Sequence, residues 1–281
     1  MKSIHEALPI RGDLALVIAN EIIDLIQKKF NIKLSPLGST GKKSKDQYSG
    51  DIDIAIEYDW NNYKDILDYL KESTNCIIGN INQNLHVFNI GYFYLEESIK
   101  KCVQIDFMFT DNIDYSKFAF NSPDYTKNES KYKGMYQSAL LMAIISNTPN
   151  EYPIEYYESR EIKSYWKYFL NQYKGLLIEH KSFEGKTKRL KNPTTIETKF
   201  ITNNPIDIVY LCLGDKATLN TCQTFENELD FICSKKYKYY SKEQLVKIKK
   251  AFLNDWQIRL KTDESLLKEF EDLFNEKINS L

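Results

Sequence analysis

The stretch that decides the fold runs from residue 37 to residue 54 and reads LGSTGKKSKDQYSGDIDI. It joins a Gly-Ser turn to a polar, basic loop and then to two carboxylates two residues apart in an apolar run. Because side chains alternate along a strand, Asp51 and Asp53 are expected on one face, while Ile52 and Ile54 enter the core. Two carboxylates side by side repel each other unless a cation lies between them. The pattern therefore indicates a site for a divalent metal ion.

The elements around this stretch follow from hydrophobic periodicity, which separates helical spacing from strand alternation. In chain order the sequence predicts a helix at 13–30, strands at 32–37 and 51–58, a helix at 61–72, and strands at about 76–81, 85–94 and 101–110. This order predicts an α+β domain with a mixed sheet and flanking helices.

After residue 110 helical periodicity dominates the chain. The predicted helices are 129–146, 159–179, 205–213, 223–234, 241–258 and 263–278. We therefore expect two domains: residues 1–125 with the sheet, and residues 126–281 as a mostly helical region.

Composition and charge narrow the class of protein. The chain has 281 residues, of which 42% are hydrophobic and 27% are charged, which is ordinary for a globular protein. Its net charge of -1 gives no overall attraction to nucleic acid or membrane. No apolar run approaches the ~20 residues that span a bilayer, so no membrane partner is expected.

Location in the cell is predicted from the N-terminus and the cysteines. Glu6, Arg11 and Asp13 interrupt any secretory apolar region. The five cysteines are scattered, odd in number and without a CxxC pair, which is typical of reduced, core-filling thiols. We expect a cytoplasmic protein.

Gly38-Ser39, eleven intervening residues and then Asp51-Ile52-Asp53 resemble the defining motif of the polymerase-β-like nucleotidyltransferase superfamily. That family also uses a third carboxylate on a later strand of the same sheet. Asp106 matches this position, because it is the only acidic residue within the strand expected at 101–110.

The resemblance implies a reaction class and a role for each residue. Two metal ions about 3.5–4 Å apart stabilise the attacking and leaving oxygens of an in-line displacement on phosphorus. Asp51, Asp53 and Asp106 would hold these ions, Mg²⁺ or Mn²⁺, and Asp106 would help to deprotonate the acceptor hydroxyl. The co-substrate would be a nucleoside triphosphate (NTP), such as ATP, whose monophosphate moves to a hydroxyl as pyrophosphate leaves.

The turn and its loop are the expected nucleotide-binding part. Gly38 lets the backbone approach the phosphates, and the Ser39 hydroxyl and neighbouring N–H groups, such as that of Thr40, can bind phosphate oxygens. Lys42 lies in the loop that follows and is expected to screen the triphosphate. Lys133, at the start of the next helix, is a further candidate ligand, although a solvated helix start is the more common explanation.

Several simpler interpretations compete with this assignment. An isolated Asp-x-Asp on a strand is commonly a solvated face, and only the turn and Asp106 together favour a metal site. The loop also imitates a phosphate-binding P-loop, but GxxxxGK[ST] needs Gly at Pro36 and Ser or Thr at Lys43. The three histidines show no metal or catalytic spacing.

Two basic segments bear on the acceptor. Residues 160–191 carry nine basic and three acidic residues, and residues 235–250 carry seven and one, both with interleaved aromatics. Such segments bind phosphate backbone and stack bases, although lysine-rich outer faces of helices give the same pattern. They weakly favour a nucleic-acid acceptor such as a tRNA-like 3′ end. A protein or small-molecule acceptor, a toxin, and a non-catalytic binding protein stay open, as do base preference and oligomeric state.

Overall fold

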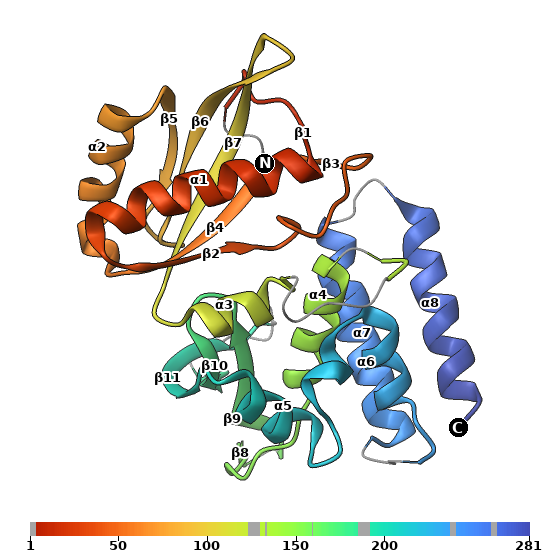
Figure 1. The fold of residues 1–281 in the computed structure, drawn as a ribbon. Coiled ribbons are helices and arrows are strands. Elements are labelled where there is room, and N and C mark those ends of the chain that lie inside the picture. Colours follow the sequence, from red (N-terminus) through yellow and green to blue (C-terminus); the bar gives the residue numbers. More distant parts are fainter. Residues whose placement is uncertain are drawn as a thin grey trace. The chain divides into compact units, whose positions relative to one another are not determined.

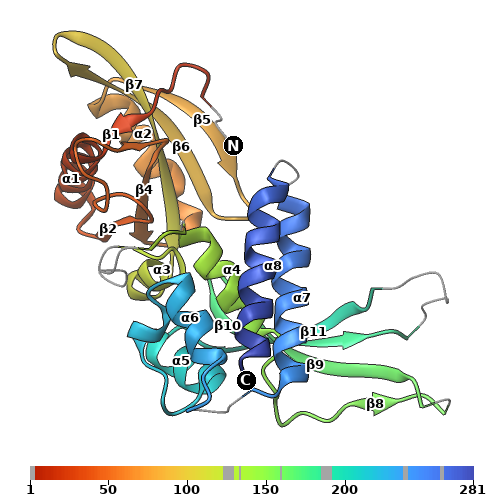
Figure 2. The ribbon, with the colours of Figure 1, turned by 90° about the vertical axis from the view of Figure 1, so that its right-hand side faces the viewer.

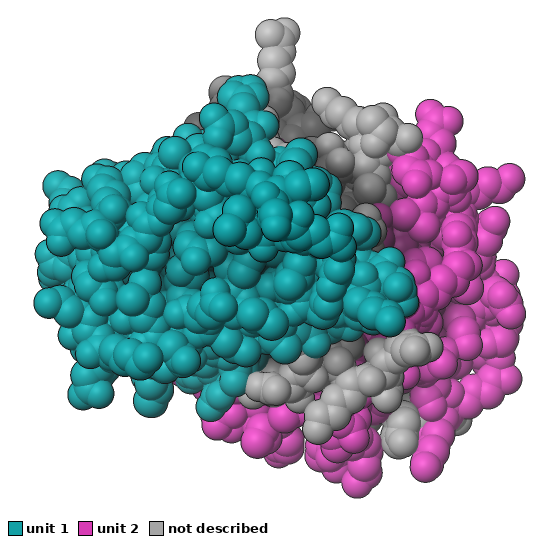
Figure 3. All heavy atoms as spheres, turned by 45° about the horizontal axis from the view of Figure 1, so that its top comes forward, with its two compact units in different colours: residues 1–127 teal, residues 128–281 magenta. Residues whose placement is uncertain are grey.

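The computed structural model describes residues 4–122, 130–132, 134–158, 160–184, 192–236, 240–259 and 263–281. The chain divides into two compact units, residues 1–127 and 128–281, which Figure 1 draws as a ribbon and Figure 3 shows in two colours. The predicted α+β class, with a mixed sheet and a largely helical C-terminal part, is confirmed.

Unit 1 (residues 1–127) is built on a five-stranded sheet in the order β2-β4-β7-β6-β5. β4 and β7 run parallel, and every other neighbouring pair is antiparallel. The elements are β1 (Ile10–Arg11), α1 (Gly12–Phe30), β2 (Lys33–Leu37), β3 (Tyr48–Ser49), β4 (Ile52–Glu57), a short 3-10 helix (Trp60–Asn62), α2 (Tyr63–Ser73), β5 (Cys76–Asn82), β6 (Val87–Glu96), β7 (Ile99–Thr110) and α3 (Ile113–Ala119). The helices and strands predicted for this part of the chain are therefore present, with small shifts of their ends.

One face of this sheet forms the main core of unit 1 with α1 and α2. Ile18, Ile22 and Ile26 recur at helical spacing along α1 and pack with Ile52 and other alternating apolar residues of the strands. Each isoleucine that is fully buried in this way contributes about 1.5–3 kcal/mol. The alternation along β4 and β7 consequently directs their intervening polar side chains to the opposite face.

The opposite face of the sheet is covered at its two ends. At one end α3 packs on β2 and β4, where Ile113 meets Leu37 and Ala55. At the other end Ile4 and Ala7 pack against Cys102 of β7. The polar residues at the middle of β4 and β7 lie between these two small apolar clusters.

Unit 2 (residues 128–281) combines helices with a second sheet. Its elements are α4 (Gly134–Ile145), β8 (Glu155–Tyr156), β9 (Ile162–Asn171), β10 (Gly175–Ser182), β11 (Thr194–Thr202), α5 (Pro205–Leu213), a 3-10 helix (Leu219–Cys222), α6 (Phe225–Ile232), α7 (Lys242–Arg259) and α8 (Glu264–Asn279). α4 is apolar almost all round, as expected of a helix at the centre of a bundle, and packs against α6 and α7. α8 packs against α7.

The helix predicted at 159–179 is wrong. Residues 162–171 and 175–182 instead form β9 and β10, an antiparallel hairpin within a sheet in the order β11-β10-β9-β8. Aromatic residues such as Tyr165 and Trp166 favour a pleated, half-buried surface. The Asn171 side chain closes the turn by accepting the backbone N–H groups of Tyr173 and Lys174. β11 was not expected from the sequence.

Two further findings bear on the class of protein. No helix in the described parts of the chain combines the length and the apolar composition needed to cross a membrane. All five cysteines are free, and four of them are buried, which fits the predicted core-filling role.

Candidate active site

The sheet brings two of the three predicted carboxylates together. β4 and β7 are parallel neighbours, and their register places Asp53 directly beside Asp106. Ile52 and Ile54, which flank Asp53, are fully buried in the core of unit 1, so the alternation expected from the sequence holds. Asp51 lies just before β4, two residues from Asp53. Its charge acts on the carboxyl groups of both Asp53 and Asp106, so the three carboxylates are close to one another.

Burial and the repulsion between like charges shift the pKa values of these carboxyl groups. Burial raises the pKa of the Asp53 carboxyl well above its usual value, and the charges of Asp51 and Asp106 raise it further, against a small opposing effect of Lys43. Burial also raises the pKa of Asp106 to about 6; the charge of Asp51 adds to this, and a hydrogen bond opposes it. Carboxylates held in this way favour a cation among them.

Gly38 is required where the turn meets these carboxylates. Its φ is +57°, in the left-handed region that side chains rarely adopt. A Cβ placed on it would lie 2.8 Å from Oδ2 of Asp53. The absence of a side chain at Gly38 therefore leaves the space that the Asp53 carboxylate uses.

Hydrogen bonds fix the loop that follows Gly38. Thr40 is buried, and its hydroxyl oxygen accepts the backbone N–H of Asp53 at 3.2 Å. The hydroxyls of Ser39 and Ser49 lie 3.1 Å apart. The Lys42 ammonium donates to the carbonyl of Asn121, and its burial lowers the Lys42 pKa to about 8. The loop is thus tied both to β4 and to the segment after α3.

Two residues of this site were missed by sequence reasoning. Gln104 is buried, and its Nε2 donates to Oδ1 of Asp106 at 2.8 Å, which orients that carboxylate. Ser122, also buried, accepts the backbone N–H of Gly38 at 3.0 Å. Alternation along β7 puts Gln104 on the face of Asp106 and is a usable signal, whereas Ser122 is 84 residues from Gly38 and has none.

The donor set fits a hard divalent cation. Three carboxylates supply the oxygen ligands that Mg²⁺ and Mn²⁺ prefer, and their mutual repulsion is relieved by such an ion. Within the described ranges no three His, Cys, Asp or Glu side chains are already arranged as a metal site. Binding would therefore need the Asp51, Asp53 and Asp106 side chains to rotate toward a common point.

One predicted site residue is not placed by the structure. Lys133 lies outside the described residues.

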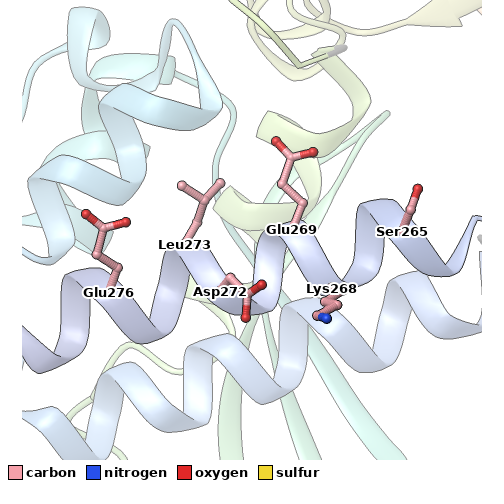
Figure 4. A pocket seen from close by; sticks show the side chains of 6 residues that line it. All are labelled: Ser265, Lys268, Glu269, Asp272, Leu273 and Glu276. Atoms are coloured by element: carbon pink, nitrogen blue, oxygen red, sulfur yellow. The ribbon is translucent and has the colours of Figure 1, made fainter.

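A shallow pocket of about 360 Å³ is lined by α8 alone (Figure 4). Its lining residues are Ser265, Lys268, Glu269, Asp272, Leu273 and Glu276. It contains none of the predicted site residues, and its acidic lining does not suit a triphosphate.

Some charged and aromatic groups of the two basic segments have partners within unit 2. In the first, Lys163 pairs with Glu184 at 3.8 Å and Lys181 with Glu179 at 2.6 Å, and residues 185–191 lie outside the described ranges. In the second, the Tyr240 hydroxyl donates to a backbone carbonyl. Part of the charge and aromatic surface counted in the sequence is therefore used within unit 2.

Comparisons with known proteins return structures only. No family model and no curated protein matches the chain. Among solved structures, Leishmania infantum polymerase beta in a ternary complex is 12% identical, with a TM-score of 0.42, over 76% of this chain and 77% of that one. A cytoplasmic RNA terminal U-transferase is 8% identical, with a TM-score of 0.29, over 82% and 67%. These scores are too low to assign a family, so the function rests on the site itself.

Proposed function

We propose that the chain is a metal-dependent nucleotidyltransferase that moves a nucleoside monophosphate from an NTP to a hydroxyl group, with release of pyrophosphate. The observation that carries this proposal is the register of β4 on β7, which sets Asp53 beside Asp106 within reach of Asp51. The turn lies against the same carboxylate at Gly38, where an added Cβ would come within 2.8 Å of Oδ2 of Asp53.

Each residue has a role in this proposal. Asp51, Asp53 and Asp106 would hold the cations, which supply charge neutralisation at the phosphates and activate the attacking hydroxyl. Asp106, oriented by Gln104, takes the proton of the acceptor hydroxyl. The Ser39 hydroxyl, half-buried at the turn, is the group we assign to a phosphate oxygen. Lys42 would reach the triphosphate only after leaving the Asn121 carbonyl.

For the acceptor we favour a nucleic-acid 3′ end. Lys163 and Lys167 share one face of β9 with Tyr165 and Phe169, because side chains alternate along the strand. Basic and aromatic side chains on one surface suit a phosphate backbone and its exposed bases. Contacts of this kind are made mainly to phosphates, so we expect binding that weakens strongly as salt is added.

The experiment that tests the proposal is incubation of the purified chain with each α-labelled NTP, Mg²⁺ or Mn²⁺, and total RNA. Label in RNA supports the proposal together with its acceptor. Label in protein or in a small molecule supports nucleotidyl transfer but shows that the acceptor is not RNA.

A non-catalytic protein that binds nucleotide or nucleic acid is the competing class. It needs no set of three adjoining carboxylates, which is why we do not favour it. If the chain binds the labelled NTP but no product carries label with either metal, the chain is a non-catalytic binding protein and not an enzyme.

A further inference from the structure

β11 forms an open edge of the sheet in unit 2. It pairs with β10 on one side, and no strand of the described residues pairs with its other side (Figure 2). All seven residues from Thr194 to Phe200 are exposed. They include two large apolar side chains, Ile196 at 60% and Phe200 at 58% exposure. A long exposed edge of this kind presents unpaired backbone N–H and C=O groups to another chain.

The edge is regular only at its centre. The pairing of β11 with β10 is irregular at two places, which leave Ile196 and Ile201 without a partner in the register. Between them Glu197, Thr198, Lys199 and Phe200 pair in unbroken order with β10. Such irregularities limit unwanted pairing along an edge, so a partner strand would have to match this central segment.

The central segment is complementary to itself when it is reversed. If two copies of Thr194–Thr202 lie antiparallel with Thr198 opposite Thr198, Glu197 of each copy falls opposite Lys199 of the other. By the same count, Ile196 falls opposite Phe200, and Thr194 opposite Thr202. Opposite charges and apolar pairs facing each other across strands each stabilise a sheet.

We propose that β11 pairs antiparallel with β11 of a second copy of this chain, around a two-fold axis at Thr198. The two four-stranded sheets then continue into one. A two-fold axis brings the same patch of both copies together, so a strand on that axis must be complementary to itself. β11 meets this condition.

The charges on β11 distinguish this partner from others. Glu197 and Lys199 already form an ion pair at 3.4 Å within the chain, and both side chains are about half exposed. A second copy adds the same two charges in the reverse order, so that four charges alternate around the axis. A nucleic acid gains nothing from β11, because Glu197 cancels the charge of Lys199.

Sedimentation equilibrium across the micromolar range tests the proposal with the full chain. We expect a reversible monomer–dimer equilibrium for the wild type. Glu197→Lys and Lys199→Glu each replace two attractive cross-strand pairs by two repulsive ones and should weaken dimerisation about tenfold or more. The double variant E197K/K199E restores the complementary order and should recover the dimer.

A mixing experiment makes the test independent of folding defects. E197K and K199E chains are each self-repulsive but complement each other, so a mixture should form a one-to-one heterodimer. Glu243→Lys and Lys247→Glu, which reverse an exposed ion pair of 2.9 Å on α7, are matched controls and should leave dimerisation unchanged.

A cross-link locates the axis. Thr198→Cys should be joined between two copies by a short bismaleimide, whereas the wild type, treated in the same way, should not. A wild type that stays monomeric, single reversals that dimerise as well as the wild type, or a mixture that forms no heterodimer would each overturn the proposal. All of these outcomes are independent of nucleotidyl transfer.

Discussion

At the scale of single residues, Gly38 sets the space for the Asp53 carboxylate. Gly38→Ala should cost about 1 kcal/mol of stability, because alanine is strained at its φ of +57°. The added Cβ would also displace Oδ2 of Asp53, which it approaches to 2.8 Å. A displacement of this kind lowers turnover by about 100-fold. Thermal unfolding and label transfer, measured on the same sample, check both numbers.

The same loop supplies a control for this prediction. A Cβ placed on Gly50 would meet no atom within 4 Å, so Gly50→Ala should retain wild-type turnover. Equal turnover in the two variants would show that the contact of Gly38 with Asp53 does not matter for the reaction.

Gln104 gives a second prediction at this scale. Gln104→Leu keeps the size of the side chain but removes the hydrogen bond to Oδ1 of Asp106. Loss of a group that orients a ligand typically costs about 10–100-fold in metal affinity or activity. Mn²⁺ binding by calorimetry should weaken accordingly, and turnover should fall while the unfolding temperature changes little. Wild-type Mn²⁺ affinity in this variant would remove Gln104 from the site.

The sequence is informative about residues that are close in the chain or share a strand. The expectation that Asp51 and Asp53 share one face follows from strand alternation alone. The neighbourhood of Asp53 and Asp106 required a family resemblance, because it depends on which strands are neighbours in the sheet. The contact of Ser122 with Gly38 is tertiary, and no local pattern encodes it.

At the scale of elements, the error at residues 159–179 has a physical cause. A window over 159–179 spans the turn at 172–174 and parts of both β9 and β10, so its apolar residues show the spacing of one long helix. The run Tyr165-Trp166-Lys167-Tyr168-Phe169 is the kind of segment that prefers a strand, and this preference outweighs a weak helical pattern. Helices without an interior turn, such as α5 and α8, were predicted nearly to the residue.

Packing of α4 against α6 buries a carboxyl group that predicts a pH dependence. Glu228 is fully buried; Gln137 donates to its Oε1 at 2.6 Å, and the Cys222 thiol also donates to this carboxyl group. Burial raises the pKa of Glu228 well above the usual 4.5. The folded state therefore holds a proton that the unfolded state has lost. Stability should be greatest below about pH 4.5 as far as this group is concerned, and should decline as the pH rises toward its raised pKa.

Glu228→Gln tests this dependence. The variant keeps an oxygen for Gln137 but cannot ionise, so it should exceed the wild type by about 1 kcal/mol or more at pH 8, since one pKa unit corresponds to about 1.4 kcal/mol. The difference should shrink toward pH 5. Urea unfolding at both pH values measures it. Glu276→Gln, an exposed position on α8, is the control. A difference that does not change with pH would contradict the assignment.

At the scale of the whole molecule, unit 1 has a hydrophobic core of its own. The clusters around Ile22, Cys102 and Leu37 contain residues of unit 1 alone. A fragment of residues 1–127 should therefore fold by itself and unfold cooperatively, which circular dichroism and a thermal scan would show. A fragment without cooperative unfolding would mean that the core of unit 1 depends on residues beyond 127.

The central claim concerns the three carboxylates, and it is tested most directly by metal-dependent transfer of label from an α-labelled NTP. Wild-type chain should transfer label with Mg²⁺ or Mn²⁺ and lose this activity on chelation. Asp53→Asn and Asp106→Asn should each lower the rate by at least about 100-fold, whereas Asp24→Asn, on the exposed side of α1, should have no effect. Transfer at the wild-type rate by the Asp53 or Asp106 variant would contradict the account.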